Sequence, residues 1–231
     1  MSNKNRIDSC ESCTQKWRSF SYLSKDELNY INQNRYEAIF KTGEIILKQG
    51  SPSSNALFLA SGLAKVYFEG LNGKNLIMSL AKPGRMIIGP GVYVNSRHAY
   101  TASAILPVQA CFVHFDVFRH LIRTNGAFAE SFIQEISANS LRIHNRLVNL
   151  TQKKMPGRMA ETILYLSNDI FNSDEFDMIL SRNELGEMSN MAKECVVRII
   201  KEFEGSGILV SHGSRIKIHD KEKLNTISER S

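Results

Sequence analysis

The sequence predicts an α+β protein in which a β-rich domain, a long helix and a small helical domain follow one another. Three observations predict this order: short apolar runs broken by turn residues over about 41–118, a seven-residue apolar repeat over 126–150, and helical periodicity with cap signals after residue 156. The composition, 42% hydrophobic and 23% charged, is that of a globular protein. Because the chain lacks a long apolar run and an apolar segment behind its first charges, we expect no membrane span, no secretory signal and a cytoplasmic location.

The amino-terminal part is predicted to be a tail over residues 1–20 followed by a β-domain over residues 21–125. Residues 21–40 have a helical pattern, in which Ser24 caps the helix and Asp26 and Glu27 occupy its first turn. After residue 41, apolar runs such as EIILK, ALFLASG and QACFVHF alternate with turn-forming clusters. The segment 69–74 between two such runs is a plausible hairpin loop. Short strands at this spacing are typical of a sandwich, a barrel or a jelly roll.

Residues 126–152 are predicted to form a helix that pairs two copies of the chain. Apolar residues recur there at alternating steps of four and three, which defines a coiled-coil seam. The alternative is a single helix that packs on its own domain. We favour the parallel dimer because the seam is long and only Ser140 is polar. The predicted seam consists of Ala129, Ile133, Ile136, Ser140, Ile143, Leu147 and Leu150.

Residues 153–231 are predicted to form a winged helix-turn-helix. Pro156 and Gly157 break the preceding helix, and a further helix is expected over 158–171. Ser181 can cap the next helix, because Glu184 follows three residues later as a capping box requires. A short turn, a second helix that ends at a Gly-x-Gly sequence and two short β-runs over 208–218 complete the pattern.

One face of the second helix is predicted to enter the major groove of double-stranded DNA. Arg198 can donate two hydrogen bonds to guanine, Glu194 can accept one from cytosine, and Arg182 suits a phosphate. The alternative is an ordinary solvated face. Residues 151–231 hold 12 Lys and Arg against 13 Asp and Glu, so attraction to phosphate must come from a local surface. The candidate DNA-binding residues are Arg182, Lys193, Glu194, Val197, Arg198 and Lys201.

These tracts resemble the family of the catabolite activator and the fumarate–nitrate reductase regulator (CRP/FNR). The resemblance rests on PGRMAETIL over 156–164, SRNELG over 181–186, KECVVRII over 193–200 and GLAKV over 62–66. It implies a cyclic-nucleotide-binding-like β-roll as sensor domain, a dimerisation helix and a winged helix-turn-helix that reads a near-palindromic site as a homodimer. It also implies RNA polymerase as a partner. The family's Glu and Arg base contacts map onto Glu194 and Arg198.

The sensor domain departs from the residues that hold cyclic AMP in this family. The ribose-binding Glu of the family tract F-G-E-x-x-L is replaced by Pro90, and Arg97 is followed by His98 rather than by Ser or Thr. A ribose needs an acceptor and a cyclic phosphate needs donors, so the sequence argues against cyclic AMP as the effector. A small effector is expected in a pocket formed by Gly89, Pro90, Gly91, Arg97, His98, Tyr100, Ile143 and His144.

The cysteines raise the question of a cofactor. Cys10, Cys13 and Cys111 match three of the four positions that hold an iron–sulfur cluster in the fumarate–nitrate regulator, but no cysteine stands in the region of Ser19 and Ser21, where another is needed. Zinc and haem remain alternatives, with the scattered histidines as possible haem ligands. We favour free or redox-active thiols, so the cofactor is left unknown and these cysteines remain candidate metal ligands.

The sequence therefore predicts a DNA-binding transcription regulator controlled by an unknown effector or by a redox signal. A second class is a sensor module that dimerises without binding DNA. A third class, an enzyme with a cupin-like barrel, needs a cluster of metal-binding histidines on its strands. His98 and His114 do not form an H-x-H pair, so we do not expect an enzyme.

Overall fold

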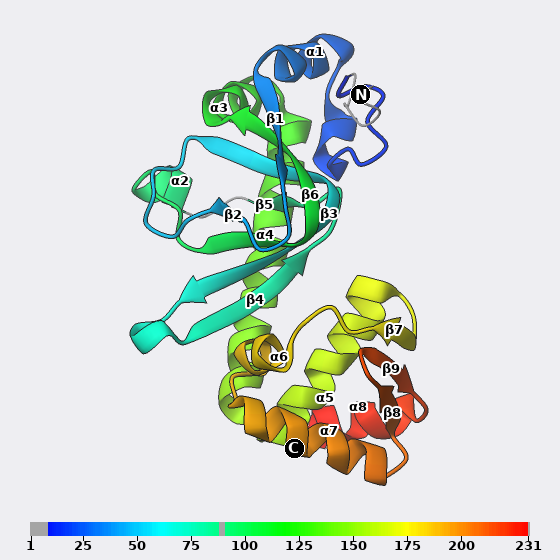
Figure 1. The fold of residues 1–231 in the computed structure, drawn as a ribbon. Helices are drawn as coiled ribbons and strands as arrows, with labels where there is room; N and C mark the ends of the chain where they lie inside the picture. The colour runs from blue at the N-terminus through cyan, green and yellow to red at the C-terminus, as the bar shows by residue number, and fades with distance from the viewer. Residues whose placement is uncertain (1–8, 88–90, 231) are drawn as a thin grey trace. The chain divides into compact units, whose positions relative to one another are not determined.

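The computed structural model describes residues 9–87 and 91–230 and confirms the predicted α+β architecture (Figure 1). The chain divides into two compact units, one formed by residues 1–68 and 80–140 and the other by residues 69–79 and 141–231. Among the described helices, none has the length and apolar character that crossing a membrane requires. Each unit is described below by itself.

The β-roll of the first unit is organised around strand β6 (Thr101–His114). β6 pairs antiparallel with β1 (Arg35–Phe40), β2 (Ile45–Leu47) and β3 (Asn55–Glu69), while β4 (Asn75–Ala81) and β5 (Met86–Ile87) join β3. The register between β3 and β6 shifts at several bulges, which let two long strands curve instead of forming a flat ribbon. The concave side encloses a core that includes Leu57, Leu59, Ala102, Ala110 and Phe112.

The predicted helix over residues 21–40 is only partly correct. A 3₁₀ turn (η1, Arg18–Tyr22) precedes α1 (Lys25–Gln33), Ser24 caps α1 as predicted, and Glu27 completes a capping box with it. Residues 35–40 are strand β1 rather than helix. Their six backbone partners on β6 outweigh the helix propensity of Glu37 and Ala38, a tertiary effect that local sequence does not encode.

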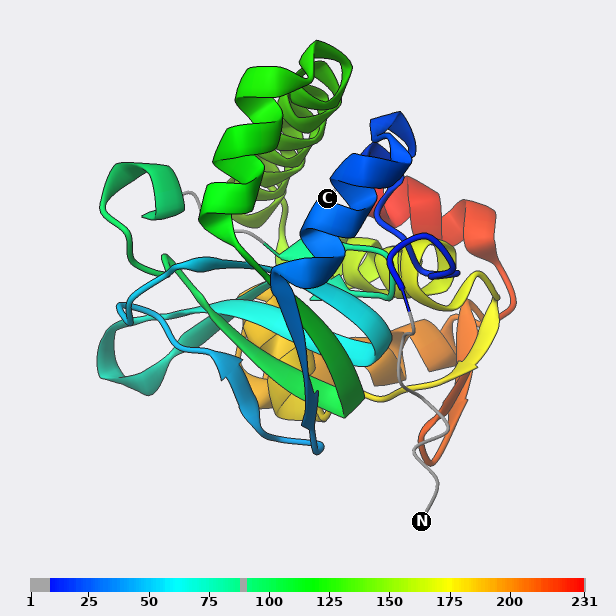
Figure 2. The ribbon, with the colours of Figure 1, turned by 90° about the horizontal axis from the view of Figure 1, so that it is seen from above.

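Helices close one end of the roll around a cluster of aromatic side chains. α1, α3 (Phe115–Thr124) and the first turns of α4 (Gly126–Gln152) lie together at this end (Figures 1 and 2). The Trp17 ring lies 5.5–6.2 Å, between ring centroids, from five phenylalanines of the cluster. Ser131 also donates to Ser19 at 2.8 Å, so the amino-terminal segment is fixed to α4 by both apolar and polar contacts. The five rings are Phe20, Phe58, Phe118, Phe128 and Phe132.

The second unit begins with the carboxy-terminal half of α4. Asn149 and Lys153 both donate to Glu161 of α5 (Met155–Tyr165). α5 begins three residues earlier than predicted, because Pro156 and Gly157 lie in its first turn, where a missing amide hydrogen costs no helical hydrogen bond. A π-helical turn (Leu166–Phe171) extends α5 and ends at Asn172, which is left-handed. The helix predicted over 158–171 is therefore α-helical only as far as Tyr165 and π-helical from Leu166 to Phe171.

The rest of the second unit is the predicted winged helix-turn-helix. It contains α6 (Arg182–Ser189), α7 (Lys193–Gly205) and a sheet in which β9 (Arg215–Ile218) lies between β7 (Glu175–Asp177) and β8 (Leu209–His212). A final helix, α8 (Lys221–Arg230), packs on α5 and buries Leu224. Neither β7 nor α8 was predicted from the sequence pattern.

The bulged β3–β6 ladder depends on Gly62. This residue has a φ of +85°, and an added Cβ would lie 2.1 Å from the carbonyl oxygen of Pro107. Gly43 has a similar φ of +87° but open space around it, so it provides a matched control. We expect Gly43→Ala to cost about 1–2 kcal/mol from the left-handed backbone alone. Gly62→Ala should cost clearly more, because the β6 backbone must also move, and urea unfolding of both variants measures the difference. Equal losses would contradict this assignment.

Candidate functional site

The helix-turn-helix is fixed locally by hydrogen bonds that its own sequence supplies. Ser181 accepts from the backbone of Glu184, whose carboxylate accepts from the Ser181 amide at 2.8 Å, so the predicted capping box begins α6. Asn190 takes a left-handed conformation with φ of 51° and ends α6. At Gly186 an added Cβ would lie 2.5 Å from the Met191 carbonyl oxygen. Only glycine therefore lets the turn approach α6 this closely.

Helix α7 has one buried face and one exposed face. Val196, Ile199, Ile200 and Phe203 are buried and fix the orientation of the helix. Arg198 is held by Glu202 at 2.7 Å, an exposed pair one helical turn apart. The outward residues of α7 are one, three or four positions apart in the sequence, so they lie on one stripe along the helix. The exposed stripe consists of Lys193, Glu194, Val197, Arg198 and Lys201.

Arg182 differs from the expectation for an exposed phosphate ligand. It stands at the start of α6 but is half-buried, and its Nη1 is shielded from solvent without a hydrogen-bond partner. The structure therefore does not place it among the exposed residues of the α7 stripe.

The wing, formed by β8 and β9, has two cationic residues, Arg215 and Lys217, that were not among the predicted DNA-binding residues. Arg215 and Lys217 on β9 both contact the Glu175 carboxylate of β7, at 2.8 and 3.4 Å. Hydrogen bonding and charge from Lys217, followed by the charge of Arg215, lower the pKa of Glu175. Arg215 and Lys217 alternate in the sequence, which predicts that both lie on the same face of a strand. Their acidic partner, Glu175, lies about 40 residues earlier and could not be predicted from local sequence.

All predicted seam residues lie on α4, and most of them are exposed. The exposed fractions are 62% for Ile133, 47% for Ile136, 46% for Ile143 and 58% for Leu147, and Ser140 is exposed as well. Ala129 and Leu150 are half-buried. Leu141 and Val148 flank the seam and are also exposed. Apolar exposure on this scale along one helix is typical of an interface.

The residues of the predicted effector pocket do not form one described site. Gly89 and Pro90 lie outside the described residues, and Gly91 begins the short helix α2 (Gly91–Val94). Arg97 is exposed and donates to the Gly50 carbonyl at 2.6 Å. Ile143 and His144 are exposed on α4 and belong to the other compact unit. The pocket that combines these residues stays a prediction.

Of the remaining members of this set, His98 is buried and Tyr100 is half-buried. His98 is 8% exposed, its Nδ1 has no hydrogen-bond partner, and burial lowers the pKa of the imidazole. Tyr100 packs edge-to-face on Phe68, and burial raises the pKa of its phenol. A histidine with a lowered pKa stays neutral at pH 7, so it offers one donor and one acceptor rather than a cation.

A cavity that the sequence analysis missed lies beside His98 in the first unit. Its volume is about 350 Å³, within the range of small-molecule sites. It forms because two loops are joined: the Gly50 amide donates to the His98 carbonyl at 2.8 Å, and the His98 amide donates to the Ser51 carbonyl at 2.9 Å. The lining includes Tyr36, Ile45, Lys48, Ser51, Asn55, His98 and Phe112.

The three cysteines of the predicted cofactor site do come together. Cys10, Cys13 and Cys111 line one cavity of about 30 Å³, although Cys111 lies on β6, far from the others in sequence. Cys10 and Cys111 are buried and Cys13 is half-buried. Burial raises the pKa of Cys10, and it raises the pKa of Cys111 to about 11, so both are protonated thiols at pH 7.

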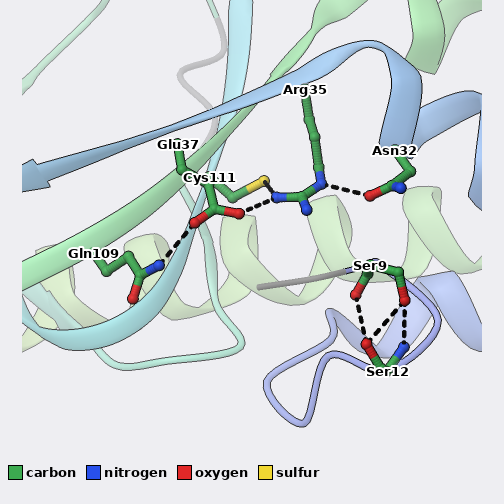
Figure 3. Close-up of polar contacts among 7 residues, drawn as sticks. All are labelled: Ser9, Ser12, Asn32, Arg35, Glu37, Gln109 and Cys111. Carbon is green, nitrogen blue, oxygen red and sulfur yellow. Dashed lines mark hydrogen bonds and ion pairs between the residues drawn. The ribbon is translucent and has the colours of Figure 1, made fainter. Parts of the chain in front are cut away.

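Arg35 is the cation of this thiol cluster, defined as Cys10, Cys13 and Cys111. Its guanidinium donates to Asn32 at 2.8 Å, to Glu37 and to the Cys111 sulfur at 3.8 Å (Figure 3). Gln109 donates to the same Glu37 carboxylate at 2.7 Å. The guanidinium is therefore held in place by β1, β6 and the end of α1.

These residues do not fit an iron–sulfur cluster. Such a cluster is held by four thiolates in most proteins, whereas three thiols are present here and the fourth cysteine of the chain, Cys195, lies in α7. The cavity has room for about one water molecule, and a guanidinium contacts one of the sulfurs. Among the described residues, no three His, Cys, Asp or Glu side chains are arranged to hold a metal ion.

Two of the histidines considered as haem ligands, His114 and His120, have other partners. His114 caps α3 by accepting from the Asp116 amide at 3.4 Å, and His120 packs edge-to-face on Tyr30.

Comparison with known proteins agrees with this architecture. Residues 37–125 match the cyclic nucleotide-binding domain, and residues 157–227 match the Crp-like helix-turn-helix domain. Electron transport regulator A of Shewanella oneidensis is 24% identical, over 98% of this chain and 95% of its own length. The anaerobic regulatory protein of Pasteurella multocida is 23% identical, over 95% and 82%.

The solved structure of FixK2 from Bradyrhizobium japonicum has the same fold. It superposes with a TM-score of 0.77 at 17% identity, over 85% of this chain and 98% of that one. The β-roll, the helix-turn-helix and these relatives together identify the chain as a member of the CRP/FNR family of transcription regulators.

Proposed function

We propose that this regulator binds a near-palindromic promoter site as a homodimer, with one α7 helix in the major groove of each half-site. The observation that carries the proposal is the exposed stripe of α7, which stands opposite a fully buried apolar face. A recognition helix needs this division, because one face must be rigid while the other must reach base edges. Two copies related by a two-fold axis then read two inverted half-sites.

Within the stripe, each residue type supports a different contact. Arg198 can donate to guanine O6 and N7, Glu194 can accept from cytosine N4, and Val197 can pack on a thymine methyl group. Arg198 must leave Glu202 to do so, which costs little because exposed ion pairs contribute only about 0–1 kcal/mol. Lys193 and Lys201 provide phosphate contacts. The Nη1 atom of Arg182 is buried, so we assign this residue no base contact. Its role is to orient α6 against the sugar-phosphate backbone of the DNA.

We propose that the chain dimerises through α4, because this helix exposes apolar side chains that a second copy can bury. The exposed seam of Ile133, Ile136, Ile143 and Leu147 is apolar enough to stabilise a second helix by removing this surface from water. We infer RNA polymerase as a further partner, because the chain belongs to a family of transcription regulators.

The controlling signal is an unidentified small effector or a redox change, and we propose that it is not cyclic AMP. Pro90 replaces the acidic ribose ligand of the family. His98, which follows Arg97, is buried and neutral. A neutral imidazole does not supply the hydroxyl donors that a cyclic phosphate receives in relatives that bind it. The cavity beside His98 offers room for a different small molecule.

The DNA-recognition role is tested first on Arg198. We expect Arg198→Ala to weaken binding to a site selected from random DNA by roughly 5- to 150-fold, since one bidentate guanine contact contributes about 1–3 kcal/mol. Affinity at fixed salt, measured by fluorescence anisotropy, gives the change.

Arg230→Ala is the matched control, because it removes the same charge from an exposed position on α8. It should weaken all DNA sequences slightly and equally. If Arg198→Ala and Arg230→Ala lose the same affinity on the selected site, α7 is not the recognition helix.

The dimer is tested at Leu147. Leu147→Asp places a charge on the seam of both copies and removes the burial of two leucines, each contributing about 1.5–3 kcal/mol. We expect the dimer dissociation constant to rise by about 100-fold or more, as measured by sedimentation velocity over a range of concentrations. Asn145→Asp introduces the same charge at an exposed position away from the seam and should leave the dimer intact. An unchanged dimer in Leu147→Asp would rule out the α4 seam.

A further inference from the structure

Three of the four cysteines of this chain converge on one small cavity for which the family resemblance supplies no fitting cofactor. Two come from the turn that begins at Cys10, and the third comes from β6. The Ser12 amide donates to the Ser9 hydroxyl at 3.1 Å, and the two hydroxyls are 2.9 Å apart, so the turn is internally fixed (Figure 3). Cys10 lies inside this turn and Cys13 directly follows it, so both thiols belong to one short loop beside the cavity.

The thiols differ in their access to solvent. Cys13 is half-buried, whereas Cys10 and Cys111 are buried behind it with Trp17 and Phe20. A dissolved oxidant therefore reaches Cys13 first. Cys10 lines the same cavity and lies only three residues from Cys13 in one short loop, so it is the partner that we assign to an oxidised Cys13.

The positive charges of the cavity favour thiol chemistry and disfavour a bound cation. Arg35 contacts the Cys111 sulfur, and Lys16 lines the same cavity. Both cations act to lower the pKa of Cys10 against the larger effect of burial. They stabilise the negative charge that develops on sulfur when a thiol attacks, while they repel a metal ion from the same position.

We propose that Cys10 and Cys13 form a reversible disulfide on exposure to a hydroperoxide, so that this member of the family has a thiol redox site in the place of a metal cluster. The required Cα separation of about 4.4–6.8 Å is compatible with the turn. Cys111 stays reduced, because it is buried on a paired strand and is held by Arg35.

The reaction consists of two steps. The Cys13 thiolate attacks one oxygen of the hydroperoxide, the O–O bond breaks, the other oxygen leaves with the electron pair, and Cys13 becomes a sulfenic acid. The Cys10 sulfur then attacks the Cys13 sulfur, the S–O bond breaks, and the hydroxide leaves as water with the Cys10 proton. The two sulfurs lose two electrons and the hydroperoxide gains them, and a dithiol reductant reverses the change.

The site is placed to influence the dimerisation helix. The cysteine turn leads directly into Trp17, which lines the thiol cavity and packs edge-to-face on Phe128 and Phe132 of α4 at 6.1 and 6.0 Å between ring centroids. A disulfide in the turn changes the position of Trp17 and therefore the support of the first turns of α4. That this changes DNA affinity rests on the proposed function, whereas the disulfide itself does not.

The disulfide is tested on the full-length protein without DNA. Reduced protein, freed of reductant, is treated with hydrogen peroxide and assayed for free thiols under denaturing conditions, and its disulfides are mapped by peptide mass spectrometry. We expect free thiols to fall from four to two per chain with a Cys10–Cys13 linkage. Loss of no thiols, or a linkage that includes Cys111 or Cys195, overturns the proposal.

Variants separate the role of Cys13, which reacts with the hydroperoxide, from that of Cys10, which closes the disulfide. In Cys10→Ser, Cys13 should be trapped as a sulfenic acid that dimedone labels, and in Cys13→Ser no disulfide should form. Cys195→Ser, at a half-buried position on α7, is the control and should lose two thiols like the parent. Dimedone labelling at Cys111 instead of Cys13 would contradict the order of events.

A final measurement connects the site to regulation. DNA affinity of the oxidised parent should differ from that of the reduced parent by about 5-fold or more, the range of ordinary allosteric coupling. Cys13→Ser should show no difference. An unchanged affinity in the oxidised parent overturns the link to regulation, whereas failure of the reduced protein to bind any DNA overturns the proposed function and leaves the thiol result intact.

Discussion

The amino-terminal unit depends on the packing of Trp17 among five phenylalanines. These rings come from four separate parts of the chain: the amino-terminal segment, β3, α3 and α4. Large aromatic side chains dominate core energetics because each removes much apolar surface from water. One buried tryptophan thus joins the roll to the first turns of α4. It also positions the cysteine turn, because Trp17 and two of the cysteines lie in one short segment.

The carboxy-terminal unit is organised by a different kind of constraint, which is mostly local. The capping box at Ser181, the left-handed Asn190 and the close approach at Gly186 define the turn between α6 and α7 from residues within ten positions of one another. Tertiary packing then needs only to bury one apolar face of α7, and the exposed stripe follows from helical geometry. This is why Lys193, Glu194, Val197, Arg198 and Lys201 could be grouped correctly from their spacing. Arg182 could not be placed this way, because its burial depends on neighbours outside its own helix.

Burial also determines the chemistry of the amino-terminal unit. It keeps His98 neutral and Cys10 and Cys111 protonated, so these buried side chains contribute no charge of their own. Arg35 is a charged residue next to Cys111: Glu37 and Gln109 fix it beside this thiol, and together these residues exclude a second cation from the position. The proposed thiol chemistry depends on this arrangement, in which a guanidinium stands beside the Cys111 sulfur.

Local sequence was enough to predict the order of the β-rich domain, the long helix and the winged helix-turn-helix, as well as the Ser24 cap, the Ser181 capping box and the outward face of α7. Each of these depends on residues that are close together in the chain. The tertiary structure decided that residues 35–40 form strand β1 and that α8 packs on α5. It also decided that Glu175 contacts the wing, and that Cys111 shares a cavity with Cys10 and Cys13. All of these require partners from distant parts of the chain. Spacing and periodicity record which residues can face the same way, whereas contact between distant segments is settled only when the whole chain packs.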